Sequence, residues 1–390
     1  MLELNLAYRN IKGAGLRTWL NVAVLSFIYV IIIWHQGLFS GMLKQGARAM
    51  LEDEIAGGQY WHKNFDPFDP LSFDESHGQI PKELSALISN KKATPILFRQ
   101  AAIYPEGRIQ TVLLRGIDPQ QSVLNIPSHN LNSSGDEVPI LIGERMAKNI
   151  AAKIGDFITI RWRDVNGTFD AVEGKIVAIM KTDVAGIDKG QLWIPLQELR
   201  RMTCLPNEAS IIVVDQSVSP GGEYADWKFK SQEFLMRDIT SMVKSKRISG
   251  GILYAILLFL AMLAIFDTQV LAIFRRRKEI GTLIALGMTR RQVVTVFTLE
   301  GALHGILAIF LAALYGIPFL MYSAKTGMAL PQTTEDYGFA LATRLFPSYS
   351  LGLVLITILV VMSIVTIVSF MPSRKISHLN PTEALKGKIS

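Results

Sequence analysis

The chain of 390 residues has a single cysteine, Cys204, so it cannot form an intrachain disulfide and its cysteine usage indicates no redox compartment. Its six histidines are scattered without metal-ligand spacing. The sequence also lacks a G-x-x-x-x-G-K-[ST] phosphate loop, a G-x-S-x-G nucleophile motif and an H-E-x-x-H zinc motif. These absences predict a chain with no metal, no catalytic residues and no ATP site of its own. A membrane-anchored hydrolase remains a formal rival that no such motif supports.

Basic charge is scarce where a nucleic-acid partner would need it. The net charge is +7, but residues 44–247 carry 25 basic and 26 acidic side chains. The excess lies in three short clusters beside apolar segments, at residues 9–17, 275–291 and 374–388. This distribution is typical of membrane topology, and it argues against nucleic acid as a partner.

Long apolar runs are what the chain does contain. Residues 250–274 form an apolar segment of about 25 residues, and roughly 20 are enough to span a bilayer. Four successive cations, Arg275–Lys278, follow, and a basic pair, Arg290 and Arg291, precedes the next apolar segment. This pattern predicts two membrane helices joined by a basic cytoplasmic loop. With 49% hydrophobic residues overall, membrane helices make up only a minority of the chain.

We therefore predict an α-helical membrane protein with four transmembrane helices and an α+β extracytoplasmic domain inserted between the first two. Four spans place both termini on one side, and the three cationic clusters share that side, which is therefore cytoplasmic. The predicted segments are a cytoplasmic segment (1–18), the first span (19–43), a periplasmic domain with stalk helices (44–248), the second span (249–274), a cytoplasmic loop (275–292), the third span (293–322), a short periplasmic loop (323–348), the fourth span (349–371, ending at Pro372) and a cytoplasmic tail (372–390).

The domain between the first two spans alternates short apolar runs with turn signals, which is typical of an α+β fold. Apolar residues recur near helical spacing from Trp227 to Ile248, so we expect a stalk helix that continues into the second span through Phe274. Such a rod would be about 70 Å long. The candidate strands are 95–104, 109–115, 156–163, 171–181 and 209–215, and the candidate helices are 143–152 and 196–202.

The loop between the second and third spans contains EIGTLIALGMTRRQ, which is too short and too polar to cross a membrane. Its apolar residues recur at helical spacing, which predicts a short amphipathic helix. That helix either rests on lipid headgroups or docks into a soluble cytoplasmic partner, and the residues alone leave both open. The apolar face consists of Ile280, Leu283, Ile284 and Met288.

This loop, RRRKEIGTLIALGMTRRQVVTVFTLEG, resembles the FtsX-like permease family of ABC transporters, which includes MacB, LolC and LolE. The opening LAYRNIKGAGLRTWL, the internal LIGERMAKNIAAKIGDFITI and the closing SRKISHLNPTEALKGK resemble further segments of that family. The likeness therefore extends over nearly the whole chain. Met288 departs from the pattern, because the family usually has a small residue there.

The resemblance implies that the short helix is a coupling helix contacting a cytoplasmic ATPase dimer that binds ATP and Mg in place of this chain. It also implies a second permease chain, identical or paralogous, and a bacterial inner-membrane location. The implied function is lipoprotein or lipid release, or export of a periplasmic substrate with a periplasmic or outer-membrane partner. The alternative is a transducer that controls a cell-wall hydrolase. The implied coupling residues are Glu279, Ile280, Gly281, Leu283, Leu286, Gly287, Met288 and Thr289.

Three ionisable side chains, Asp267, Glu300 and His304, lie within or near the predicted spans. Such groups are costly in lipid, so we expect them to pair or to reach the interface, with proton relay as the alternative. His304 follows Glu300 by four residues and is expected to satisfy it. Two small-xxx-small pairs predict close helix packing. They are Gly37 with Gly41, where the alternative is chance, and Gly301 with Gly305, where the alternative is ordinary core packing.

Overall fold

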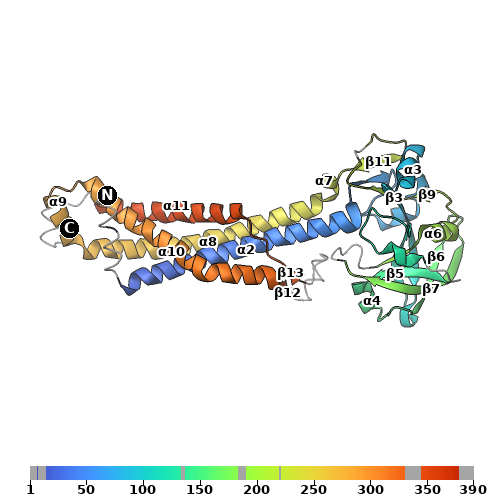
Figure 1. Cartoon of the computed structure of the whole chain (residues 1–390), viewed down its shortest axis with the longest axis horizontal. Helices are drawn as coiled ribbons and strands as arrows, with labels where there is room; N and C mark the ends of the chain where they lie inside the picture. Colours follow the sequence, from blue (N-terminus) through green and yellow to red (C-terminus); the bar gives the residue numbers. More distant parts are fainter. Residues whose placement is uncertain are drawn as a thin grey trace. The chain divides into compact units, whose positions relative to one another are not determined.

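The computed structural model (Figure 1) describes residue 7 and residues 15–132, 137–182, 190–218, 221–329 and 344–376. Most of the predicted N-terminal segment, part of the short periplasmic loop and most of the tail lie outside these residues. The chain forms two compact units. We call residues 1–42, 242–328 and 346–390 the helical unit, and residues 43–241 and 329–345 the α+β unit.

Among the described residues 15 to 376, the helical unit contains four long helices and one short one (Figure 1). The long helices are α2 (Leu16–Met50), α8 (Arg237–Arg275), α10 (Arg290–Thr326) and α11 (Leu351–Ile376), and the short one is α9 (Arg277–Ala285). All four long helices are long and apolar enough to cross a membrane. Their shared core contains Leu25, Ile265, Ala308 and Val365, one from each helix.

The outer faces of these helices are also apolar, which is the pattern of helices immersed in lipid. Phe310 and Leu314 on α10 are 71% and 76% exposed, and Leu351 on α11 is 83% exposed. In water such a surface would cost free energy, whereas lipid tails accept it. The described helical unit therefore has the surface of a membrane bundle.

The α+β unit contains a nine-stranded sheet in the order β11-β1-β10-β3-β4-β8-β5-β7-β6, and β3 also pairs with β6. That extra pairing closes the circuit β3-β4-β8-β5-β7-β6 around a buried core that includes Leu114, Ile140 and Ile160. The strands are β1 (Gly58–His62), β3 (Ala93–Ile103), β4 (Gln110–Ile117), β5 (Val138–Gly143), β6 (Phe157–Arg163), β7 (Phe169–Met180), β8 (Gln191–Pro195), β10 (Ile211–Val214) and β11 (Trp227–Lys230).

Shorter elements complete the fold. They are the helices α3 (Lys82–Ser89), α4 (Glu144–Asn149), α6 (Leu196–Thr203) and α7 (Gln232–Leu235), the π-helix η1 (Leu51–Ile55), the 3₁₀ turns η2 (Pro70–Asp74), η3 (Pro105–Gly107) and η4 (Ser128–Leu131), and the strands β2 (Gly78–Gln79), β9 (Glu208–Ala209), β12 (Met328–Ala329) and β13 (Arg344–Leu345). The five candidate strands and two candidate helices are confirmed within a few residues. The sequence interpretation missed β1, β5, β8 and β11.

The predicted stalk helix from Trp227 is wrong at its start. Residues 227–230 form β11 and pair antiparallel with β1, with Lys230 opposite Gln59. The letters WKFK alternate apolar and polar residues, which is the strand period rather than the helix period. Helix α8 begins at Arg237 and has 39 residues, so it is about 58 Å long instead of 70 Å.

The predicted end of the fourth span at Pro372 is also wrong, because α11 continues to Ile376. Proline removes only one backbone donor here, and nearby hydroxyls bond the chain one turn back. Ser369 Oγ donates to the Val365 carbonyl at 2.8 Å, and Ser373 Oγ donates to the Ser369 carbonyl at 2.7 Å. Such hydroxyl bonds help a membrane helix to tolerate proline.

Candidate functional site: the α8–α10 connection and its polar neighbours

The short helix α9 turns its apolar face toward its own chain. Ile280 is 1% exposed and forms a buried cluster with Ile273 of α8 and with Val293 and Phe297 of α10. Ile284 and Met288 pack against the same cluster. The expectation that this face rests on lipid or docks into a partner is therefore wrong for Ile280. Its side chain instead fixes α9 against both neighbouring helices.

The opposite side of this connection is exposed. Leu286 is 79% exposed. Glu279, Gly287 and Thr289 are also exposed, whereas Gly281 is buried, and the side chain of Leu283 lies outside the described set. Lys278, Arg290 and Arg291 are exposed around them. We call residues 285–291 the exposed turn, an apolar tip with flanking cations.

The geometry of the exposed turn comes from its backbone. Helix α9 ends at Ala285, so Leu286, Gly287, Met288 and Thr289 do not belong to it as the sequence suggested. Gly287 has φ of +98°, a conformation that side-chain-bearing residues rarely adopt. Thr289 caps α10 in a reciprocal box with Gln292, whose side chain accepts from the Thr289 N–H at 2.9 Å. The turn is therefore a defined reversal between two helices.

Glu300 is 3% exposed on α10 and pairs with Arg276, which sits at the break between α8 and α9. Arg276 Nη1 lies 3.2 Å from Glu300 Oε2 and donates a hydrogen bond to it. Arg276 Nε is also 4.0 Å from Glu279 Oε2. We expected these intramembrane groups either to pair or to reach the interface. Glu300 is paired.

The other two intramembrane groups differ from Glu300. Nδ1 of His304 lies 2.6 Å from the backbone carbonyl oxygen of Glu300, a contact made to the main chain rather than to the carboxylate. Asp267 is exposed on α8, whereas its neighbour Thr268 accepts a hydrogen bond from the Asn21 side chain of α2 at 2.9 Å. Glu300 and His304 are therefore together, and Asp267 is on the bundle surface.

The two glycine pairs pack closely, but only one pair contacts a helix. Gly301 lies against Ser369, and a Cβ placed on Gly305 would be 2.6 Å from Met362 Sδ, so this pair forms a seam between α10 and α11. Gly37 and Gly41 instead meet residues 346–349, the segment before α11, and the Ser348 N–H donates to the Gly37 carbonyl at 2.9 Å. The first pair thus accommodates a loop, not the helix that the pattern suggested.

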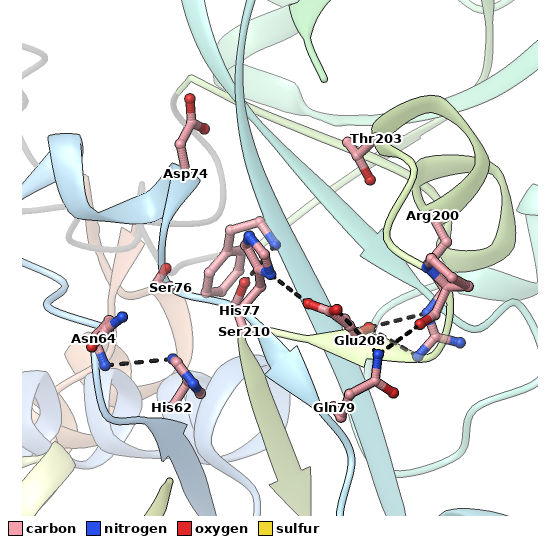
Figure 2. A network of polar contacts seen from close by, with 12 residues as sticks. His62, Asn64, Asp74, Ser76, His77, Gln79, Arg200, Thr203, Glu208 and Ser210 are labelled. Atoms are coloured by element: carbon pink, nitrogen blue, oxygen red, sulfur yellow. Dashed lines mark hydrogen bonds and ion pairs between the residues drawn. The ribbon is translucent and has the colours of Figure 1, made fainter. Parts of the chain in front are cut away.

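The α+β unit contains a separate polar network (Figure 2) that joins β2, β9 and α6. His77 is hydrogen-bonded to the carboxylate of Glu208, which also accepts from Gln79 at 3.1 Å. Arg200 donates twice to the Glu208 carbonyl, at 3.1 and 3.0 Å. Nearby, burial lowers the pKa of His62. The bonds that Glu208 makes with His77, Gln79 and Arg200 tie separate segments together, which fits a structural role.

Comparisons with known proteins bear on the helical unit most directly. Residues 251–381 match the family model described as FtsX-like permease C-terminal. The chain is 20% identical to the lipoprotein-releasing system transmembrane protein LolC of Neisseria meningitidis serogroup B over 360 residues, 83% of this chain and 85% of the relative. It is 21% identical to LolC of Xylella fastidiosa over 334 residues, 75% of this chain and 77% of the relative.

A solved structure is also similar to part of the chain. It is the extracellular domain of the noncanonic ABC-type transporter YknZ from Gram-positive bacteria. That match covers 42% of this chain and 84% of the solved one, with 12% identity and a TM-score of 0.27. Residues 251–381, which match the FtsX-like permease model, include α9, the exposed turn and the Arg276–Glu300 pair.

Proposed function

We propose that this chain is the permease subunit of a MacB/LolCDE-like ABC transporter in a bacterial inner membrane. A separate ATPase dimer binds ATP and Mg, and a second permease chain, identical or paralogous, completes the complex. The FtsX-like domain and the likeness to LolC support this assignment. The single observation that carries it is the exposed turn, where Leu286 presents an apolar tip among cations on a connection that is otherwise packed inward.

The packing of α9 supports a mechanical role for that turn. A push on Leu286 would be transmitted through Ile280, whose side chain is buried against Ile273 of α8 and Val293 of α10. Tightly packed side chains move together, because a gap between them forfeits dispersion contacts. Helix α8 then continues without a break from Arg275 back to Arg237, which belongs to the α+β unit. Movement of α9 is therefore passed along α8 toward the α+β unit.

The location of the parts follows from charge. With both termini and the basic residues around α9 in the cytoplasm, the α+β unit lies in the periplasm, where ATP-driven movement acts on the substrate. Release of a lipoprotein or lipid is our first substrate class, and export of another periplasmic substrate is the second. The alternative function is an FtsX-like transducer that controls a cell-wall hydrolase, which would use the same coupling.

Leu286→Asp tests the coupling role. The change places a charge at an exposed apolar tip, so it should leave the fold intact while it disrupts an apolar contact with the ATPase. We expect the purified complex to lose most of its ATPase subunit or its ATPase activity, at least about tenfold. Ile109→Asp is the matched control, because Ile109 is also an exposed aliphatic residue, at 71%, but lies in the α+β unit.

A complex that retains its full ATPase content and activity with Leu286→Asp would refute the assignment of the exposed turn. The two functions are separated by what copurifies with the intact complex. Mass spectrometry that finds bound acyl chains or lipoprotein supports release, whereas a stoichiometric cell-wall hydrolase without lipid supports the transducer.

A further inference from the structure

An aromatic cavity of about 500 Å³ lies within the α+β unit, which is within the size range of small-ligand sites. Its walls include Trp61, Phe65, Phe73 and Phe98. The Phe65 and Phe98 rings are 5.3 Å apart between centroids, and the Trp61 and Phe65 rings are 5.0 Å apart. Most of the cavity surface is therefore suited to the apolar part of a ligand.

Two polar side chains line the same cavity from neighbouring strands. Arg115 of β4 and Gln191 of β8 are only 7% and 8% exposed. The Arg115 guanidinium lies between Phe98 and Trp193, 4.9 and 5.0 Å from their ring centroids, and it pairs with Glu54 at 3.6 Å. Within the described residues, Arg115 Nε and Gln191 Oε1 have no hydrogen-bond partner. One donor and one acceptor are thus buried without a partner, which costs free energy. A ligand that hydrogen-bonds to them would remove that cost.

Basic side chains gather beside the aromatic walls. A neighbouring cavity of about 390 Å³ shares Trp61 and Phe234 with the first and is lined by Lys228 and Lys230. Lys230 Nζ is 4.6 Å from the Phe234 ring centroid, and the Arg237 guanidinium is 5.5 Å from it. Two of the basic side chains that line the cavities are paired, Lys63 with Asp226 at 3.0 Å and Arg115 with Glu54. Among the other charged lining residues, three are basic and two are acidic: Lys228, Lys230 and Arg237 against Asp66 and Asp238.

We propose that these two neighbouring cavities, which share part of their lining, bind an anionic amphiphile. The aromatic cavity takes its apolar part, Lys228 and Lys230 hold its anionic group, and the unmatched pair Arg115 and Gln191 hydrogen-bonds an amide or hydroxyl within the apolar part. The charge balance selects an anion over a cation, and the aromatic walls select an amphiphile over a small inorganic ion.

Part of the cavity lining comes from the ends of helices that continue as candidate membrane spans. Glu54 and Ile55 of the π-helix η1, which directly follows α2, form one part of its lining. Phe234 of α7 and Arg237, the first residue of α8, form another. A bound amphiphile would therefore contact the ends of two helices that continue as candidate spans.

Photolabelling of the full chain tests this proposal. The chain is placed in nanodiscs of zwitterionic lipid, without ATPase or nucleotide, and exposed to N-dodecanoylglycine that carries a diazirine in its acyl chain. We expect labelled peptides within residues 50–73 and 228–238, competed by unlabelled N-dodecanoylglycine. N-acetylglycine, which lacks the chain, and the neutral N-dodecanoylglycinamide should compete at least about fivefold less well.

Two variants sharpen the result. Lys230→Glu should lower labelling of these peptides about fivefold or more, whereas Lys82→Glu, an exposed lysine on α3, should leave it unchanged. Leu113→Trp, which fills the cavity from a half-buried position, should abolish it. Labelling confined to the spans, or equal competition by the neutral amide, would overturn the proposal. Because no ATPase is present, failure here leaves the proposed coupling function untouched.

Discussion

The Arg276–Glu300 pair offers a quantitative test of the helical unit. The two side chains are 21% and 5% exposed, so the carboxylate is much better buried than the guanidinium. Glu300→Gln removes the charge with little change in volume, and Arg276 then loses a charge-assisted bond of about 1.5–3 kcal/mol. Arg276 can still reach solvent and Glu279, so we expect a loss of about 2 kcal/mol of stability. Arg276→Gln removes the guanidinium from a buried carboxylate and should cost more, about 3–5 kcal/mol.

The assay is a double-mutant cycle on the purified chain in a mild detergent, with unfolding followed by thermal melting or by titration with a denaturing detergent. The double variant should be more stable than the sum of the single losses predicts, by about 1–3 kcal/mol. Lys278→Gln is the control, because Lys278 is exposed on α9, outside the candidate spans, and should change stability by less than about 0.5 kcal/mol. Strict additivity would refute the pairing.

The same variants separate pairing from proton relay. If Glu300 carries protons, Glu300→Gln abolishes transport whatever happens at Arg276. If the pair is structural, the double variant regains part of the activity that Arg276→Gln loses, because it also removes the buried negative charge that Arg276 had paired with. Transport measured for all three variants at equal protein levels decides between the two.

Three further predictions concern single residues. Gly287→Ala forces a side chain onto φ of +98°, so it should cost about 1–2 kcal/mol and shift the exposed turn, detectable as a lower melting temperature. Burial lowers the pKa of His62 from its ordinary value of 6.5, so folding favours the neutral imidazole. The stability of the α+β unit should therefore be full above pH 6.5 and fall as the pH drops through that value. His62→Asn should flatten this pH dependence in melting curves recorded from about pH 7.5 to 5. Gly305→Leu should cost about 1–3 kcal/mol by crowding Met362, whereas Gly251→Leu, whose added Cβ meets no atom within 4 Å beyond its own helix backbone, should be neutral in the same melting assay.

Several features of this protein are local properties of the sequence, and these could be predicted. Span length and apolar character come from consecutive residues, so the helices that became α2, α8, α10 and α11 were expected. The seam at Gly301 and Gly305 follows from a four-residue spacing on one helix. The motif between the second and third spans pointed to the FtsX-like domain, which the match over residues 251–381 supports.

Other features depend on contacts between segments far apart in the chain. The apolar side of α9 was visible in the sequence, but only packing decided that Ile280 faces Ile273 and Val293 while Leu286 stays exposed. Pairing also decided the structure at Trp227: the segment was predicted as helix, but residues 227–230 pair with β1 and form a strand. The residues that line the aromatic cavity are spread over positions 50 to 238, so no short stretch of sequence could have predicted it. The hydropathy and charge of a segment are sums over neighbouring residues, so the sequence contains them. The burial of a side chain depends on which distant segments pack against it, and that is a tertiary property.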